Sequence, residues 1–119
     1  MNETGKLEGS CHCGNIAYEV EGEPQQAIEC NCSICQRKGI KMWFVAEGDF
    51  HLLTPEENLA TYTFNTHRIR HHFCPKCGIH AFGRGNDKNG NAVVFVNLLC
   101  LDSFDFESLP IHHFDGRNL

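Results

Sequence analysis

Seven of the eight cysteines fall into three short clusters whose spacing could hold metal ions. In chain order the clusters are C-x-C at Cys11 and Cys13, C-x-C-x-x-C at Cys30, Cys32 and Cys35, and C-x-x-C at Cys74 and Cys77. Thiolates two or three residues apart can converge on one ion, because tetrahedral zinc holds each sulfur at about 2.3 Å. Seven ligands divide as four plus three, and three protein ligands leave a position on the metal open for chemistry.

A disulfide framework is the rival interpretation of these cysteines. The first ten residues hold no apolar run typical of a secretory signal, and no stretch approaches the roughly 20 apolar residues of a membrane span. We therefore expect a cytoplasmic chain without membrane contact, whose thiols stay reduced and whose C-x-x-C pair binds metal. A redox-active C-x-x-C or an iron–sulfur site is the alternative.

Length and charge narrow the class of protein. The chain of 119 residues predicts one domain over 1–119, close to the common domain size of roughly 100–150 residues. Its core will be small, so bound metal would supply part of the folding energy. The formal net charge of −5 argues against a nucleic-acid binder or a protein that binds anionic membranes. The sequence predicts no particular oligomeric state.

The elements that must position the cysteines read as short strands. Alternating or apolar runs predict strands at 16–20, 42–45, 61–64 and 92–96. Turn signals occur at 22–24, 48–49 and 85–90. Thr54 and Pro55 could cap and begin one helical turn, and a second short helix is expected from Asp102 or Ser103. The expected fold class is all-β with one or two short helices.

The first and last cysteine clusters share a local design, because each is followed by a glycine, Gly14 or Gly78. A glycine there allows a positive φ and a turn that points backbone amides at the sulfur. We expect the two pairs to meet in one closed structural zinc site, with buried free thiols as the alternative. The ligands of this site would be Cys11, Cys13, Cys74 and Cys77.

The middle cluster predicts a different kind of site. Cys30, Cys32 and Cys35 lie in one six-residue segment with no obvious fourth ligand nearby, which favours an open Lewis-acid zinc. The alternative is a second closed site, completed by Cys100 or by a distant histidine. Cys100 lies in an apolar segment, where a free cysteine is expected to pack as a small hydrophobe.

Histidines near the clusters are expected to be surface or supporting residues rather than ligands. His12 should point outward from its cluster. His71 and His72 are adjacent on an extended segment, so at most one of them can face a site. His80 could approach either metal.

Other side chains follow the middle cluster directly. Trp43 and Phe44 are expected to join the core, or else to form an aromatic wall beside the open zinc. Three cations could lower a thiol pKa or hold a substrate carboxylate, unless they only form a solvated face. They are Arg37, Lys38 and Lys41.

Several runs together resemble the glutathione-dependent formaldehyde-activating enzyme family, which also includes centromere protein V. The runs are Gly-Ser-Cys-His-Cys-Gly at 9–14, Cys-Asn-Cys-Ser-Ile-Cys at 30–35, Phe-Cys-Pro-Lys-Cys-Gly at 73–78, Val-Asn-Leu-Leu-Cys-Leu-Asp at 96–102 and Phe-Asp-Gly-Arg at 114–117. The resemblance implies a β-tent of folded-over antiparallel sheets. It implies a structural zinc on the outer two cysteine pairs and a catalytic zinc on the middle three cysteines, two zinc ions per chain.

The resemblance also implies a reaction, the condensation of formaldehyde with glutathione to S-hydroxymethylglutathione, formally a carbon–sulfur lyase run backwards. The resulting hypothesis is a zinc-dependent enzyme in which a small thiol ionises at the open position and adds to an aldehyde. A small thiol or its aldehyde adduct is the expected partner. The alternatives are a zinc-stabilised binding module without turnover and a sensor that loses zinc on thiol oxidation.

Overall fold

The computed structural model of the chain describes residues 6–64, 67–102 and 108–115. Strands dominate these residues, with one α-helix and three short 3₁₀ turns among them. The all-β class expected from the sequence is therefore confirmed. None of the described helices is long and apolar enough to cross a membrane.

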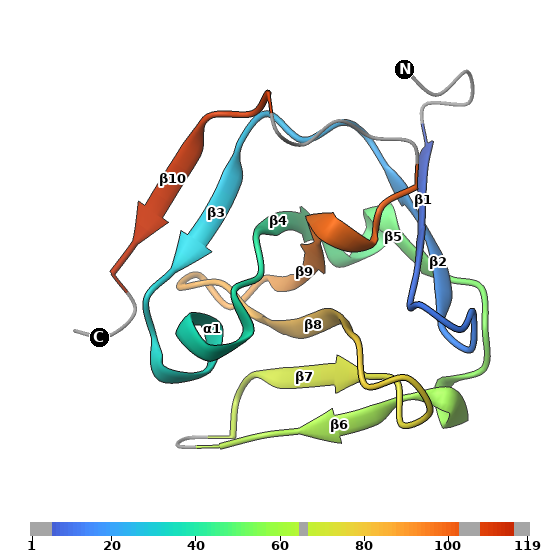
Figure 1. The fold of residues 1–119 in the computed structure, drawn as a ribbon. Coiled ribbons are helices and arrows are strands. Elements are labelled where there is room, and N and C mark those ends of the chain that lie inside the picture. Colours follow the sequence, from blue (N-terminus) through green and yellow to red (C-terminus); the bar gives the residue numbers. More distant parts are fainter. Residues whose placement is uncertain (1–5, 65–66, 103–107, 116–119) are drawn as a thin grey trace.

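The described strands form two sheets (Figure 1). The smaller sheet has the order β1-β2-β5, formed by Lys6–Ser10, Ala17–Glu21 and Phe50–Leu52. The larger sheet has the order β10-β3-β4-β9-β8-β7-β6. In that order its strands are Ile111–Phe114, Ala27–Cys30, Met42–Ala46, Ala92–Asn97, His80–Asn86, Arg70–Phe73 and Ala60–Tyr62. Neighbouring strands are antiparallel, with the exception that β10 runs parallel to β3.

The one α-helix among the described residues, α1 at Ser33–Lys38, was not expected from the sequence. It begins directly after Cys32, whose backbone is extended, and ends at Gly39. Gly39 adopts a left-handed conformation with φ of 66° and donates its N–H to the carbonyl of Cys35 at 2.9 Å. This is a glycine C-cap, in which the missing Cβ removes the steric cost of positive φ. The cap stops the helix after six residues, immediately before β4.

The 3₁₀ turns are η1 at Glu47–Asp49, η2 at Glu56–Asn58 and η3 at Leu98–Cys100. The helical turn expected at Thr54 and Pro55 is η2, which begins after Pro55. Thr54 does not cap it, because its hydroxyl accepts a hydrogen bond from the backbone N–H of Ala17 at 3.2 Å. The second short helix, expected from Asp102 or Ser103, falls mainly on residues 103–107, which lie outside the described residues.

The main hydrophobic core lies between the two sheets. Tyr18 and Phe50 of the smaller sheet meet Phe82 of β8, and the three rings lie 4.5–5.8 Å apart between centroids. Tyr18 is fully buried and donates its hydroxyl to the carbonyl of Ala81 at 3.3 Å. Rings in this arrangement bury a large apolar area, so this contact holds the smaller sheet against the larger one.

A second, smaller core covers the other face of the larger sheet. Val94 and Val96 of β9 point into the main core, whereas Phe95 between them packs with Cys35, Ile40 and Met42. Successive side chains of a strand point to opposite faces, so the two cores lie on opposite sides of this sheet. The smaller core also includes the partly buried Ile28 of β3 and Ile34 of α1.

Candidate metal centres

The outer two cysteine pairs meet at one place, as the sequence predicts. Their four sulfur atoms lie within 4.8 Å of one another. These are the Sγ atoms of Cys11, Cys13, Cys74 and Cys77. The two pairs lie on turns at the ends of β1 and β7, and the fully buried Cys74 faces the main core. We call this group the four-cysteine cluster.

The spacing of these sulfur atoms suits a tetrahedral metal ion. The Sγ atoms of Cys11 and Cys13 are 3.8 Å apart, and those of Cys13 and Cys74 are 3.6 Å apart. Four sulfurs held tetrahedrally at about 2.3 Å from zinc would be separated by about 3.8 Å. None of the eight cysteines forms a disulfide, so their thiols are available as ligands. The cluster could therefore hold a metal ion with four thiolates.

Backbone amides surround the sulfur of Cys74. The N–H groups of Lys76 and Cys77 donate to it at 3.3 and 3.4 Å, and the side chain of Asn15 donates at 3.7 Å. Burial opposes ionisation of Cys74, but these donors, first Cys77 and then Lys76, lower its pKa to about 6. Gly78 ends the turn with φ of 81°, and Gly14 ends the other with φ of 85°. The expected glycine turns are thus confirmed, whereas Asn15 was missed because its contact joins residues 59 apart.

Cys100 lies on the side of the four-cysteine cluster but is not a member of it. It packs against the main core, and burial, reinforced by the charges of Cys11 and Cys77, raises its pKa to about 11. The expectation that Cys100 packs as a small hydrophobe is confirmed. His12 is exposed, as expected.

The middle three cysteines form the second cluster. The sulfurs of Cys30, Cys32 and Cys35 lie within 4.8 Å of one another, and no other described residue offers a ligand atom within that limit. Cys30 ends β3, Cys32 precedes α1, and Cys35 points from α1 into the smaller core. The backbone N–H of Cys32 donates to the sulfur of Cys30 at 3.4 Å. We call this group the three-cysteine cluster.

The environment of the three-cysteine cluster makes its thiols unequal. Burial raises the pKa of Cys35, and neighbouring Cys32 raises it further. Burial also raises the pKa of Cys30, whereas hydrogen bonds from Cys35 and its neighbours outweigh burial and lower the pKa of Cys32. Three thiols at this spacing fit three corners of a metal coordination shell. The described residues that were candidates for completing the shell, Cys100 and the histidines, lie outside the group.

Two buried histidines lie beyond the phenylalanine that backs this cluster. The ring of His71 contacts that of Phe95 at 5.8 Å and that of His80 at 5.4 Å. Burial, followed by the charge of Lys38, lowers the pKa of His71 to about 4 and that of His80 to about 3. Both imidazoles are therefore neutral near pH 7. Among the described residues His80 belongs to neither cysteine group, in keeping with the expectation that these histidines are not ligands.

His72 points to the opposite side of β7 from His71, as strand alternation requires. Its ring packs on Phe82 at 5.0 Å, and its Nδ1 lies 3.0 Å from the hydroxyl of Thr61. Its Nε2 lies 3.4 Å from a guanidinium nitrogen of Arg84. The same guanidinium forms an ion pair with the carboxylate of Glu56 at 2.8 Å. His72 therefore belongs to the main-core side of the sheet.

The expectation that Trp43 joins the core is confirmed, and the alternative of an aromatic wall at this residue is wrong. Trp43 packs against the main core, and its strand neighbours Met42 and Phe44 point to the other face. Strand alternation therefore turns Trp43 away from the three-cysteine cluster. Phe44 contacts Phe95 at 5.8 Å between ring centroids but remains 47% exposed, so it lies at the margin of the smaller core.

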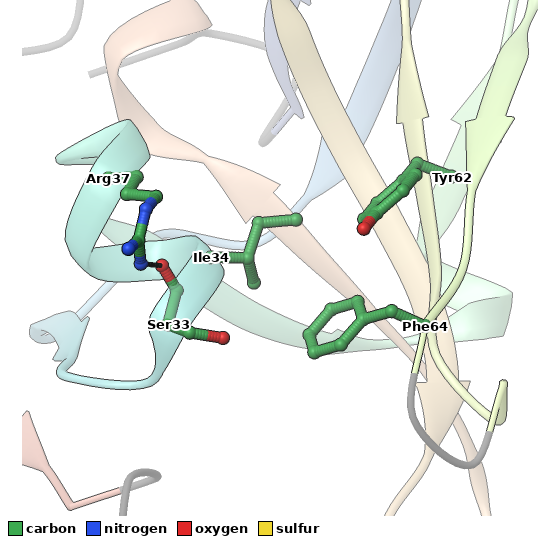
Figure 2. Close-up of a pocket in the computed structure, with 5 residues that line it drawn as sticks. All are labelled: Ser33, Ile34, Arg37, Tyr62 and Phe64. Atoms are coloured by element: carbon green, nitrogen blue, oxygen red, sulfur yellow. Dashed lines mark hydrogen bonds between the residues drawn. The ribbon is translucent and has the colours of Figure 1, made fainter.

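The three cations after Cys35 differ in their surroundings. Lys41 lies 3.7 Å from the carboxylate of Glu29, an ordinary surface ion pair. Lys38 lies on α1, where desolvation lowers its pKa and the charge of Cys35 opposes this shift. Arg37 lines an open cleft beside α1, together with Ser33, Ile34, Tyr62 and Phe64 (Figure 2). The sequence did not predict that this tyrosine and phenylalanine would contribute to a site.

These features define a cysteine-rich β-sheet protein with two candidate metal centres on opposite faces of one sheet. A family model described as glutathione-dependent formaldehyde-activating enzyme matches residues 6–114. The chain therefore belongs to the glutathione-dependent formaldehyde-activating enzyme family.

A solved structure supports the same fold. A Rhodobacter sphaeroides protein of known crystal structure has 29% sequence identity to this chain, and the two structures superpose with a TM-score of 0.75. The match covers 88% of this chain and 99% of the Rhodobacter chain. The fold expected from the family resemblance is therefore shared with a protein whose structure is known by crystallography.

Proposed function

We propose that this protein is a zinc enzyme that makes or breaks a carbon–sulfur bond in a thiol–aldehyde adduct. The observation that carries the proposal is the contrast in ligand number between the two clusters. One cluster has four thiols within 4.8 Å, and the other has three within the same limit and no fourth donor among the described residues. Four thiolates complete a structural zinc site, whereas three leave a position for a substrate.

The four-cysteine cluster supports this function indirectly. Its ligands come from two distant parts of the chain, since Cys13 and Cys74 are 61 positions apart. A metal here would join the β1 turn to the β7 turn beside the main core. The binding energy of such a structural site is folding energy.

The three-cysteine cluster would hold the reactive position. Cys30, Cys32 and Cys35 would ligate the metal, and β3 and α1 fix their relative positions. When bound there, zinc supplies a Lewis acid that favours the thiolate form of a substrate thiol at neutral pH. Phe95 and Met42 close the inner side of the cluster, so a substrate must approach from the side of α1 and the solvent.

The proposed reaction balances without an external oxidant or reductant. The thiol sulfur donates an electron pair to the aldehyde carbon, and the new carbon–sulfur bond replaces the π bond of the carbonyl. The proton lost by the thiol ends on the former carbonyl oxygen, which gives a hydroxymethyl thioether. The reverse reaction returns that proton to sulfur and releases the aldehyde.

Exchange NMR at equilibrium tests this proposal, because it separates catalysis from the spontaneous reaction. Zinc-loaded protein is added to formaldehyde with glutathione or another small thiol, and the interconversion rate of free and adduct forms is measured. Cys32→Ser should abolish any acceleration, since it removes a ligand of the three-cysteine cluster. The matched control is Cys100→Ser, which removes a thiol outside both clusters and should retain the acceleration.

Two outcomes would contradict the proposal. Equal rates with and without zinc-loaded wild-type protein, for every thiol, would favour a binding module without turnover. Equal acceleration by wild type and Cys32→Ser would place any activity elsewhere in the molecule.

A further inference from the structure

An open cleft of about 350 Å³ lies between α1 and the end of β6. Pockets for small molecules typically measure about 300–1,000 Å³ and combine apolar walls with a few polar groups. This cleft has both features, since Ile34, Tyr62 and Phe64 supply apolar surface and Ser33 and Arg37 supply polar groups. Figure 2 shows Ile34 on α1 pointing across the cleft toward the two aromatic rings.

One wall of the cleft is a short stack of rings. Tyr62 and Phe64 lie 5.8 Å apart between centroids with an interplanar angle of 23°. Phe64 stacks in turn on the buried His71 at 5.7 Å, also at 23°. The stack is therefore supported from behind, while Tyr62 remains 51% exposed and presents its ring to the solvent side. Such a wall favours a flat apolar group, because parallel-displaced rings attract one another.

The opposite wall carries a cation. One guanidinium N–H of Arg37 donates a hydrogen bond to the carbonyl oxygen of Ser33 at 2.8 Å, which fixes the side chain along α1 (Figure 2). Among the described residues no carboxylate forms an ion pair with Arg37. A guanidinium has five N–H donors, so several remain for a ligand. The planar fork of a guanidinium matches the two oxygens of a carboxylate, as it also matches a phosphate.

The cleft adjoins the three-cysteine cluster. Ser33 follows Cys32 directly in the chain, so one wall begins where the cluster ends. Ile34 takes part in both, because it lines the cleft and packs with the smaller core around Cys35. A molecule with its sulfur at the cluster could therefore place the rest of its body in the cleft.

We propose that this cleft binds the body of the substrate thiol, an aromatic group that bears a carboxylate. The ring would lie against Tyr62 and Phe64, and the carboxylate would bind Arg37. The inference deepens the function proposed above and rests on it, because it assumes that a thiol occupies the three-cysteine cluster. It predicts that a compact aryl-carboxylate thiol is preferred to a polar peptide thiol.

Four matched thiols and one thiol-free probe test the inference. The thiols are 4-(mercaptomethyl)benzoic acid, benzyl mercaptan, 3-mercaptopropionic acid and glutathione, which separate the contributions of ring and carboxylate. Binding of sulfur is read from the charge-transfer absorption of protein loaded with cobalt(II) in place of zinc. The thiol-free probe is 4-methylbenzoic acid, and its binding is read from NMR shifts of Ile34 and Tyr62 in zinc-loaded protein.

The aryl-carboxylate thiol should bind roughly tenfold more tightly than benzyl mercaptan, because it adds a charge-assisted hydrogen bond. Arg37→Gln should remove that advantage and leave benzyl mercaptan unchanged. Tyr62→Ala should weaken both ring-bearing thiols several-fold and leave 3-mercaptopropionic acid unchanged. The control for charge is Lys88→Gln, in the exposed turn between β8 and β9, which should alter none of these affinities.

The possible failures have different meanings. If 4-methylbenzoic acid shifts no cleft resonance, or if Arg37→Gln and Tyr62→Ala change no affinity, the cleft proposal is overturned whatever the cobalt spectrum shows. If no thiol changes the cobalt spectrum but 4-methylbenzoic acid still shifts Ile34 and Tyr62, the proposed function is overturned and the cleft stands as a carboxylate site.

Discussion

The two cysteine clusters differ in how the fold supplies their ligands. The four-cysteine cluster draws on two turns that are far apart in the sequence and lies beside the main core between the sheets. The three-cysteine cluster draws on one six-residue segment and lies on the other face of the larger sheet, beside an open cleft. The first arrangement links distant parts of the chain, whereas the second leaves space for a ligand. The same side chain can thus stabilise a fold or expose a reactive metal, depending on the number and origin of its partners.

The largest expected effect comes from breaking the four-cysteine cluster. Cys77→Ser removes one of its four ligands and should unfold or aggregate the chain. The metal-binding energy lost would be comparable to the free energy of unfolding of a typical domain, about 5–15 kcal/mol. Cys32→Ser should leave a folded protein that lacks one metal. Circular dichroism, thermal melting and metal analysis measure both variants, with Cys100→Ser as the control. Equal disruption by Cys77→Ser and Cys32→Ser would remove the distinction between the clusters.

A smaller loss is expected from crowding the core behind the three-cysteine cluster. A Cβ at Gly83 would lie 2.0 Å from the ring of Phe95, which packs against Cys35. Gly83→Ala should therefore displace Phe95, lower the free energy of unfolding by about 1–3 kcal/mol and loosen the nearby metal before the other one. The matched control is Gly48→Ala, because a Cβ at Gly48 would meet no atom within 4 Å. Denaturant unfolding in which both variants match wild type would show that Phe95 moves aside at no cost.

Acid should weaken the protein partly through the histidine behind the same core. Burial lowers the pKa of His71 to about 4, below the roughly 6.5 of an exposed imidazole, so between these values the unfolded chain takes up a proton that the folded chain does not. Stability therefore falls as the pH drops through this window, by about 1.4 kcal/mol per pH unit for this group. His71→Phe should reduce the slope of the free energy of unfolding against pH by about 1.4 kcal/mol per pH unit.

The measurement for His71 is denaturant unfolding between pH 4 and 7 at matched metal loading, so that the contribution of the metal cancels in the comparison with wild type. His112→Phe, on the exposed strand β10, is the control and should keep the wild-type slope. An unchanged slope for His71→Phe would show that His71 is already charged in the folded protein.

The smallest effect on stability is expected when the metal is withdrawn from the three-cysteine cluster. Purified protein should carry up to two zinc ions per chain, one for each cluster. A chelator should remove the zinc with three ligands first and leave the circular dichroism spectrum almost unchanged. Cys32→Ser should lack this fast phase. Release of both ions at one rate, together with loss of the fold, would make the clusters equivalent.

Local chemistry accounts for the parts of the fold and site that were predicted from sequence. The positive φ of Gly14 and Gly78 follows from their place after paired cysteines, and the grouping of the outer cysteines follows from the matching design of the two turns. Strands β2, β4 and β9 begin and end within one residue of the alternating or apolar runs that predicted them. Each of these signals is a pattern within a few neighbouring residues, so it can be recognised in a single sequence.

Other features of the fold and the site were not predicted. Helix α1 has only six residues, too few for a helical period to stand out from the cysteine spacing. The cleft joins Ile34 and Arg37 to Tyr62 and Phe64, which come from separate parts of the chain. The face of the larger sheet on which Trp43 lies depends on the pairing of β4 with β9. The cysteine spacing nearby carries no information about that pairing.

Sequence separation also bears on the order in which the two clusters form during synthesis. Cys13 and Cys74 are 61 positions apart, so the four-cysteine cluster requires a long loop closure and cannot form until the β7 turn has been made. The middle cysteines span a six-residue segment that can collect a metal ion while most of the chain is still unfolded. Contacts between nearby residues form early in folding, and those between distant residues form late. Metal can therefore enter the three-cysteine cluster first, and closure of the four-cysteine cluster then marks the arrival of the native topology.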